Sequence, residues 1–194
     1  GGAGFIGSHL IDKLIDSNIE INCVDSFDDF YNVDEKYTNI EKHLGNKKFQ
    51  LNKIDITNKD ELIEVFSRFR PNLVVHLAGR AGVRPSVENP EKYINTNILG
   101  TLNILDCVKE FKVTKLINGS SSSVYGNNSK IPFNELDSLN KIISPYATSK
   151  LAAEALCHSY SEMYNLNIVS LRFFTVYGPR QRPDLAIRKF ITKI

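Results

Sequence analysis

Short apolar runs typical of strands alternate along this chain with segments whose apolar residues recur at helical spacing. The pattern predicts strands at residues 19–25, 48–55, 72–79, 113–121 and 167–174. It predicts helices from Ile6 through Leu14 and at residues 34–44, 59–69, 92–110 and 146–164. Strands that alternate with helices favour right-handed crossovers. We therefore expect an α/β fold with a doubly wound parallel sheet and helices on both of its faces.

Composition and charge narrow the functions open to this chain. Its 194 residues suffice for one domain with a hydrophobic core, and 42% of them are hydrophobic. A net charge of +2 gives no reason to expect nucleic acid or a membrane as a partner. The three cysteines, Cys23, Cys107 and Cys157, lie in apolar segments without metal-ligand spacing. We therefore expect free thiols in a reducing, cytoplasmic compartment, and no metal site.

Three glycines, Gly1, Gly4 and Gly7, precede the first helical pattern at a spacing of three residues. A glycine-rich turn that leads into a helix brings backbone N–H groups and the positive helix end to one point, which suits a pyrophosphate. A Cβ atom in such a turn would hold the ligand away. The spacing differs from the common Gly-x-Gly-x-x-Gly fingerprint, so a plain tight turn is the alternative interpretation.

Acidic residues follow at the ends of the next two predicted strands. Asp25 is placed to accept both ribose hydroxyls of NAD, and its charge would repel the 2′-phosphate of NADP. Asp55 and Ile56 are similarly placed to meet the adenine ring. For each acid the alternative is a solvated carboxylate at a strand end.

Tyr146 and Lys150 are four residues apart in a predicted helix, so their side chains lie one turn apart on one face. An ammonium beside a phenol stabilises the phenolate, so a tyrosine, whose pKa is ordinarily about 10, can act as a base near neutral pH. Residues 118–126, NGSSSSVYG, end a predicted strand with hydroxyls that can bridge Tyr146 and a substrate oxygen. Helix packing for the pair, and turn formation for the serines, are the alternatives.

Several motifs together resemble a known family. They are the glycines at 1, 4 and 7, Asp25, HLAG at 76–79, NTNILGTLNIL at 95–105, SSSVYG at 121–126, YATSK at 146–150 and RFFTVYGP at 172–179. Their order and approximate spacing are similar to those of the extended short-chain dehydrogenases, and more narrowly of the NAD-dependent nucleotide-sugar epimerases. The resemblance spans essentially the whole chain. It implies a Rossmann-type doubly wound sheet, NAD as the cofactor and a UDP-sugar as the substrate.

The resemblance also implies catalytic roles. Tyr146 would be the general base and acid, Lys150 would lower its pKa and hold the nicotinamide ribose, and Ser121, four residues before Tyr125, would be the catalytic hydroxyl. Tyr146 would take the proton of the C4 hydroxyl while hydride passes to NAD, and the hydride would return to the other face of the keto sugar. No net oxidation results, so NAD can stay bound.

Binding roles follow from the same resemblance. Asn97 would help to order the site, and Ser122, Ser123 and Arg84 would contact the sugar nucleotide. The residues expected to bind NAD are Gly1, Gly4, Phe5, Ile6, Gly7, Asp25, Asp55, Ile56, Leu77, Ala78, Gly79, Asn97, Tyr146 and Lys150.

Particular residues narrow the choice within the family. The 4,6-dehydratases of the family carry an Asp-Glu pair after the catalytic threonine, where this chain has Ser122 and Ser123, so the acid and base for elimination are lacking. The stretches 76–106 and 174–191 resemble UDP-glucuronate 4-epimerases, although Gly79 and Arg80 depart from the usual residues there.

The substrate expectation depends on two further residues. Arg182 suits a sugar carboxylate, because a guanidinium pairs with a carboxylate through two hydrogen bonds. A contact to nucleotide phosphate, or simple exposure, is the alternative for Arg182. Thr175 stands where the hexose 4-epimerases usually carry an asparagine, so the resemblance implies a substrate contact, and strand-end packing is the alternative. We expect 4-epimerisation of UDP-glucuronate first, then of UDP-glucose or an N-acetyl derivative, then UDP-glucuronate decarboxylation. A non-catalytic NAD-binding module is the alternative from a different class.

The ends of the chain bear on its domain organisation. Family members begin with an apolar strand that runs into the first glycine, and they continue past residue 194 into a smaller domain. We therefore expect an internal fragment, with residues 1–178 in the NAD-binding domain and 179–194 at the start of a sugar-nucleotide-binding domain. Without its central first strand the sheet has two unpaired edges, so residues 1–194 alone should be unstable or bind NAD poorly. The family also implies a homodimer, formed through the helices at 92–110 and 146–164.

Overall fold

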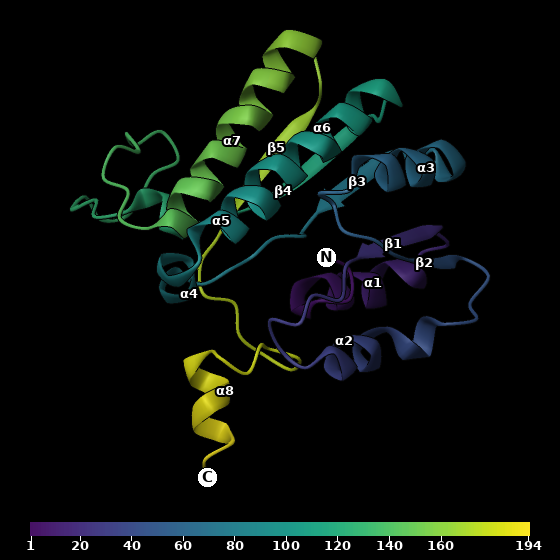
Figure 1. Ribbon diagram of the computed structural model, residues 1–194, viewed down its shortest axis with the longest axis horizontal. Coiled ribbons are helices and arrows are strands. Elements are labelled where there is room, and N and C mark those ends of the chain that lie inside the picture. Colours follow the sequence, from purple (N-terminus) through teal and green to yellow (C-terminus); the bar gives the residue numbers. More distant parts are fainter. The chain divides into compact units, whose positions relative to one another are not determined.

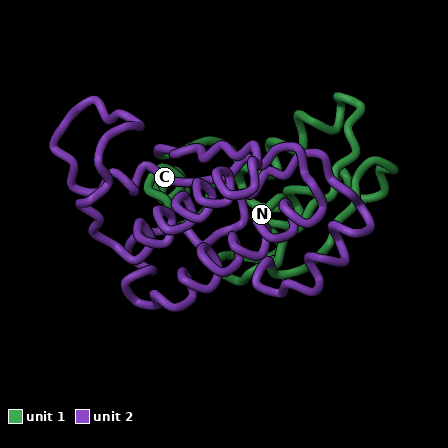
Figure 2. Tube along the Cα trace, turned by 90° about the horizontal axis from the view of Figure 1, so that it is seen from above, with its two compact units in different colours: residues 1–55, 175–194 green, residues 56–174 purple.

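The computed structural model describes all residues from 1 to 194, and the chain divides into two compact units. Unit 1 comprises Gly1–Asp55 and Thr175–Ile194, and unit 2 comprises Ile56–Phe174 (Figure 2). The last 20 residues thus pack with the beginning of the chain rather than with the residues that precede them. The assignment of 1–178 to one functional domain concerns ligand binding and stays a prediction.

Unit 1 is built on a two-stranded parallel sheet (Figure 1). Its elements are α1 (Phe5–Ile15), β1 (Ile21–Asp25), α2 (Val33–Ile40), the 3-10 turn η1 (Glu41–His43), β2 (Phe49–Lys53) and α8 (Ala186–Ile191). β1 and β2 pair in parallel, with Ile21 opposite Phe49 and Asp25 opposite Lys53. One apolar cluster joins the sheet to its helices and consists of Ala3, Ile11, Cys23, Phe27, Ile40 and Phe49.

Unit 2 is built on a three-stranded parallel sheet of order β3-β4-β5. Its strands are β3 (Leu73–His76), β4 (Lys115–Ser121) and β5 (Ile168–Phe173). Its helical elements are α3 (Lys59–Phe69), α4 (Val83–Glu88), α5 (Pro90–Tyr93), the π-helix η2 (Ile94–Leu99), α6 (Gly100–Glu110), the 3-10 turn η3 (Ser122–Tyr125) and α7 (Pro145–Tyr164). α6 and α7 lie side by side over one face of this sheet (Figure 1).

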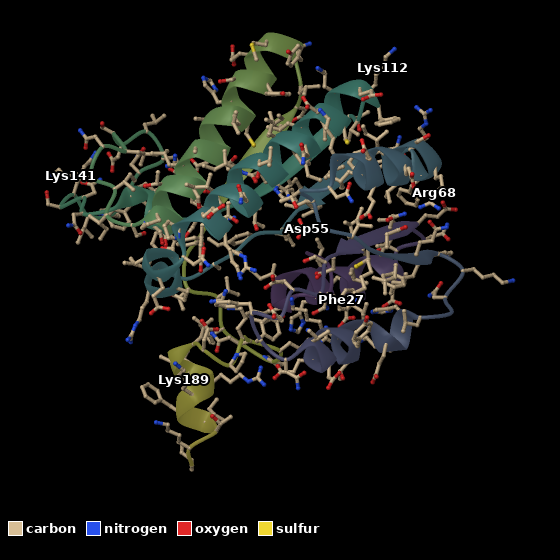
Figure 3. All side chains as sticks on the ribbon, viewed as in Figure 1. Phe27, Asp55, Arg68, Lys112, Lys141 and Lys189 are labelled. Carbon is tan, nitrogen blue, oxygen red and sulfur yellow. The ribbon has the colours of Figure 1, made fainter.

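Local signals explain where the principal helices of unit 2 begin and end. The Asn58 side chain caps α3 by accepting the Glu61 N–H, and Arg70 ends the helix in the left-handed conformation. α7 has Ser144 as its N-cap and Pro145 in its first turn, and it ends at Asn165 in the same left-handed conformation. Between η3 and α7 runs a long loop that includes Lys141 (Figure 3). The Asn127 N–H closes this loop by donating to the Lys141 carbonyl at 3.0 Å.

The predicted parallel α/β fold is confirmed, with two differences in detail. The strands form two separate parallel sheets, β1-β2 and β3-β4-β5, rather than one continuous sheet. The segment predicted as one helix at 92–110 begins at Pro90 and passes through the π-helical turn η2 before continuing as α6. Sequence periodicity did not indicate α4 or α8, because each spans only six residues.

All three cysteines are free and buried, as expected. Burial raises the pKa of each thiol to about 11, so the thiols stay protonated at neutral pH. None of the helices combines the length and the apolar character that a bilayer span requires.

Candidate active site

The glycine-rich turn of unit 1 leads directly into α1. Gly4 is the N-cap, no side chain caps the helix, and its first turn holds no acidic residue. No side chain therefore occupies the positive end of the helix, and its first backbone N–H groups can bind a ligand.

Close packing explains two glycines of this turn. A Cβ on Gly7 would collide with the Gly1 carbonyl oxygen and lie 2.7 Å from the Gly2 Cα. A Cβ on Gly2 would lie 2.5 Å from the sulfur of Cys23 in β1. At Gly4, by contrast, the nearest atom would be 3.4 Å away, an ordinary contact. Gly2 therefore fixes the approach of the turn to the sheet, a role that the spacing of three had not revealed.

Asp25 braces the glycine turn from the end of β1. Its Oδ2 accepts the Ala3 N–H at 3.0 Å, and its Oδ1 accepts the Phe27 N–H at 2.9 Å. The residue is only 7% exposed, yet a carboxylate bears about four lone pairs, so both oxygens can accept further hydrogen bonds. The turn, the helix end and Asp25 together fit the pyrophosphate and a ribose of NAD.

Asp55 and Ile56 follow β2, and their surroundings differ. Asp55 is exposed, whereas Ile56 is buried. The Ile56 side chain packs against Gly100 of α6 so closely that a Cβ on Gly100 would lie 2.5 Å from the Ile56 Cδ1. The carbonyls of Ile56 and Thr57 accept the Asn103 amide at 2.9 and 3.2 Å. Asn103 thus fixes this loop. The sequence signal that could have identified Asn103 is an asparagine among the apolar residues of a predicted helix.

Tyr146 lies in the first turn of α7. Its backbone N–H donates to Ser86 Oγ of α4 at 3.1 Å, and the Ser86 hydroxyl in turn donates to the Val83 carbonyl. The Tyr146 ring meets the Tyr93 ring edge to face, with centroids 6.1 Å apart. Ser86 and Tyr93 therefore hold the proposed base in place, and sequence reasoning had singled out neither.

Lys150 lies one turn further along α7, as predicted. Its Nζ donates to the Gly119 carbonyl of β4 at 2.8 Å. A Cβ on Gly79 would lie 3.1 Å from the Lys150 Nζ and 3.0 Å from the Asn97 Oδ1, so these three residues meet at one point. Burial lowers the pKa of Lys150 to about 8, although the nearby Cys157 and Glu154 side chains oppose the shift. The ammonium is thus poised to lose its proton in a slightly alkaline range.

Asn97 orders the loop after β3, where Leu77, Ala78 and Gly79 lie. Its Oδ1 accepts the Arg80 N–H at 2.8 Å, and its Nδ2 donates to the Arg80 carbonyl and to Ser149 Oγ, each at 2.9 Å. Asn97 is 1% exposed and stands in η2. Single π-helical turns within helices often occur at functional sites. Asn97 thus links the loop after β3 to α7, and its role in ordering a bound ligand stays a prediction.

His76 is the last residue of β3 and is buried. Burial, and the nearby charge of Lys150, lower the pKa of His76 to about 3, so its ring is neutral. The Thr101 hydroxyl donates its proton to the Asn97 carbonyl at 2.6 Å. The His76 Nε2, 3.0 Å from Thr101 Oγ1, must therefore be the donor of that hydrogen bond.

The serine cluster ends β4 as predicted. Ser121 is the N-cap of η3, and its Oγ accepts the Ser123 N–H at 3.1 Å. The two hydroxyls lie 3.1 Å apart. Ser121 is 7% exposed, whereas Ser122 and Ser123 are partly exposed. Ser121 and Ser123 are thus brought together, and their hydroxyls form a pair that can bind a sugar oxygen.

The other expected substrate residues are placed differently. Arg84 is exposed and pairs with Glu88 at 3.8 Å. Thr175 is exposed and lies in unit 1, as does Arg182. The Arg182 Nη2 donates to Asp184 Oδ2 at 3.1 Å, and its guanidinium lies 5.2 Å from the centre of the Phe30 ring.

In chemical terms, unit 2 offers a phenol, an ammonium with a lowered pKa and paired hydroxyls at the carboxyl end of a parallel sheet. Parallel α/β sheets bind ligands at that end. The set can remove the proton of a hydroxyl group and later return one. In unit 1, the glycine-rich turn and Asp25 fit a dinucleotide.

Comparison with known proteins agrees with this description. The model of the NAD dependent epimerase/dehydratase family matches residues 1–194. The chain is 47% identical over 194 residues to Protein CapI of Staphylococcus aureus, covering 100% of this chain and 58% of that protein. It is 42% identical over 191 residues to a UDP-glucuronate 4-epimerase of Thermodesulfobacterium geofontis, covering 98% of this chain and 59% of that protein.

A solved structure is similar over the whole chain. The UDP-glucuronic acid 4-epimerase of Bacillus cereus, in complex with UDP-glucuronic acid and NAD, superposes with a TM-score of 0.91 at 39% identity. The match covers 100% of this chain and 60% of that one. The present chain therefore spans about three fifths of the length of these relatives. The expected family, the fold class and the association of the family with NAD are confirmed.

Proposed function

The chain belongs to the NAD dependent epimerase/dehydratase family, and on that premise we propose that the protein containing it inverts C4 of a UDP-sugar, UDP-glucuronate before others. One observation carries the proposal. The Lys150 ammonium is buried against the Gly119 carbonyl one turn beyond Tyr146, on the strand that ends in Ser121. This arrangement joins a phenol base, a cation and a hydroxyl in one unit.

The residues divide the reaction between them. Tyr146 takes the proton of the C4 hydroxyl and later returns one, while Lys150 stabilises the phenolate. Ser121 and Ser123 bind the C4 oxygen and hold the ring in place. NAD, when bound, accepts the C4 hydride and gives it back. Gly4, Gly7 and Asp25 hold the pyrophosphate and ribose that anchor this cofactor in unit 1.

Arg182 supports UDP-glucuronate as the substrate. Its Nε is buried and has no hydrogen-bond partner in the structure, while its Nη2 reaches only the side chain of Asp184. A sugar carboxylate would accept both N–H groups in a bidentate pair. Two of the similar proteins are named UDP-glucuronate 4-epimerases, which agrees with this choice. Thr175 and Arg84 complete the proposed substrate contacts.

We also infer that residues 1–178 serve the cofactor and that 179–194 begin the part that binds the sugar nucleotide. A homodimer through the helices at 92–110 and 146–164 is consistent with exposed apolar side chains there, at Ile94, Leu99 and Met163. Sedimentation equilibrium of the whole protein tests the dimer: a single monomeric species at micromolar concentration would contradict it.

The test of function is proton NMR of the complete protein, incubated with UDP-glucuronate and no added NAD. Formation of UDP-galacturonate is expected. Loss of carbon dioxide instead would indicate the decarboxylase, and turnover of UDP-glucose or UDP-N-acetylglucosamine alone would show that the substrate assignment is wrong. If no sugar reacts even with NAD supplied, the protein is a binding module and the proposal fails.

A further inference from the structure

Glu154 is a largely buried acid on α7 that the proposed reaction does not use. It lies one turn beyond Lys150, and its side chain is only 11% exposed. The Arg172 Nη2 donates to Glu154 Oε2 at 2.9 Å, and the Arg172 Nε donates to Oε1 at 3.1 Å. The Ser120 hydroxyl also donates to Oε1. Charge-assisted bonds from a guanidinium to both carboxylate oxygens fix geometry as well as charge.

The sheet register explains how these donors meet. Ser120 of β4 and Arg172 of β5 are direct partners in the parallel ladder. Both side chains reach Glu154 on α7, so this pair of strand positions presents its side chains to the helix. The preceding strand residue, Gly119, accepts the Lys150 ammonium through its carbonyl. Two successive residues of β4 are therefore bonded to two successive turns of α7.

The same cluster reaches the serine turn. The Arg172 guanidinium lies 5.0 Å from the centre of the Tyr125 ring, and its Nη1 donates to the Glu135 carbonyl at 3.2 Å. Tyr125 ends η3, the turn that Ser121 caps. Arg172 thus ties Glu154 both to the strand that carries the catalytic serine and to the turn that follows it.

We propose that Glu154, paired with Arg172 and Ser120, is a positioning residue: it sets the height of α7 along β4 and so holds Tyr146 and Lys150 in register with Ser121. The inference rests on the proposed function for its catalytic consequence. Its structural part, the placement and charge of Lys150, can be measured without substrate. Glu154 itself touches no group assigned to the reaction.

The charge of Glu154 also acts on Lys150. The titratable or charged groups that act on Lys150 and Glu154 come from β3, α7, β5 and η3, and they are His76, Cys157, Arg172 and Tyr125. Tyr146 lies one helical turn before Lys150 in α7. His76 and the Cys157 thiol are neutral near pH 7. Glu154 is therefore the anion that favours the Lys150 ammonium, and Arg172 is the cation that offsets it.

The test uses the complete protein with lysine labelled at the side-chain nitrogen, and a Lys150→Arg variant assigns the Lys150 signal. Glu154→Gln removes the anion, so the pKa of Lys150 should fall. Arg172→Gln leaves the Glu154 carboxylate uncompensated, so the pKa of Lys150 should rise. In each variant, the high-pH limb of the profile of kcat against pH should shift in the same direction as the pKa of Lys150. Glu154→Gln should lower kcat about 10- to 100-fold with KM changed less than about twofold.

Two further variants separate positioning from general stability. Glu154→Asp keeps the charge but shortens the reach, so the Lys150 titration should stay near that of the unmodified protein while kcat is only partly restored. Asp106→Asn removes another ion pair of unit 2, in which Asp106 binds Lys59 at 2.6 Å and Tyr160 at 2.7 Å. It should lower the melting temperature and leave both kcat and the Lys150 titration unchanged.

Each outcome decides the proposal. It is overturned if the Lys150 titration is the same in Glu154→Gln and Arg172→Gln, or if Asp106→Asn lowers kcat as much as Glu154→Gln does. If the titrations shift in opposite directions but the unmodified protein turns over no UDP-sugar, the positioning role stands and the proposed function fails.

Discussion

The glycine turn of unit 1 is formed by backbone groups, whereas the Tyr146–Lys150 region of unit 2 is formed by side chains. The turn depends on side chains that are absent: Gly2 and Gly7 leave no room for a Cβ, and the groups proposed to bind the ligand are backbone N–H. In the second region, the proposed function depends on side chains that other side chains hold in place, such as Lys150 beside Asn97 and Glu154 beside Arg172.

This difference determines how each region responds to mutation. A backbone-built turn fails when any added atom enters it, because backbone atoms cannot move aside cheaply. A region built from side chains can lose one group and keep its fold, since neighbouring bonds remain. The first region should thus show large losses of stability, and the second large losses of rate.

The largest expected effect breaks only the side-chain region. Tyr146→Phe removes the proton acceptor and should lower kcat by about 10³-fold, because general base catalysis contributes on that order. NAD affinity, measured by fluorescence titration, should change little. A variant that keeps more than a tenth of the rate would show that Tyr146 is not the base.

The next largest effect breaks the backbone-built turn. Gly7→Ala forces a Cβ against the carbonyl of Gly1 and should lower the free energy of unfolding by about 2–4 kcal/mol. Gly4→Ala is the matched control in the same turn and should cost less than about 1 kcal/mol, since the new atom meets ordinary contacts. Urea unfolding of the complete protein measures both. Equal losses in the two variants would contradict the packing argument.

Acid should weaken the side-chain region through His76. The folded state holds this ring neutral, with its pKa lowered by burial to about 3 from 6.5, so the unfolded state binds the proton first. The stabilisation is complete above pH 6.5 and is lost as the pH falls toward 3. Between about pH 7 and pH 4.5 the loss should be about 2–3 kcal/mol.

His76→Gln provides the comparison for this pH dependence, because an amide can donate to Thr101 but does not titrate. The slope of unfolding free energy against pH should be shallower in this variant over the same range. Parallel curves for the two proteins would show that His76 is not the source of the acid sensitivity.

The smallest effect is expected at Ser86, which holds the first turn of α7. Ser86→Ala removes the hydroxyl that accepts the Tyr146 N–H and should cost about 1 kcal/mol in unfolding free energy. The rate should fall severalfold, because the first turn of α7 loses its restraint. A stability loss without any change in kcat would show that Ser86 holds the fold but not the base.

The features that could be predicted from the sequence are those that depend on residues close together in the chain. The helix at 59–69 was predicted to the residue because its apolar period is a local signal. The positions of Tyr146 and Lys150 on one helix face, and of Ser121 at a strand end, were predicted for the same reason.

The groups that support these residues could not be predicted in that way. Ser86 is 60 residues from its partner Tyr146, and Ser120 is 34 residues from Glu154. Each stands in a segment whose local pattern gives no sign of the contact, because the fold alone brings the partners together. The π-helical turn at Asn97 interrupts a helix whose apolar spacing reads as continuous. Tertiary packing determined these features.

The proposed reaction requires the glycine turn and the Tyr146–Lys150 region to act together, so that a hydride leaves C4 of the sugar and returns to the same carbon. UDP-glucuronate labelled with deuterium at C4, incubated in ordinary water with the complete protein, tests this most directly by mass spectrometry and NMR. We expect the UDP-galacturonate formed to keep its deuterium at C4, because the hydride never exchanges with solvent. Product with protium at C4 would contradict it, since the carbon would then have lost a proton to water rather than a hydride to the cofactor.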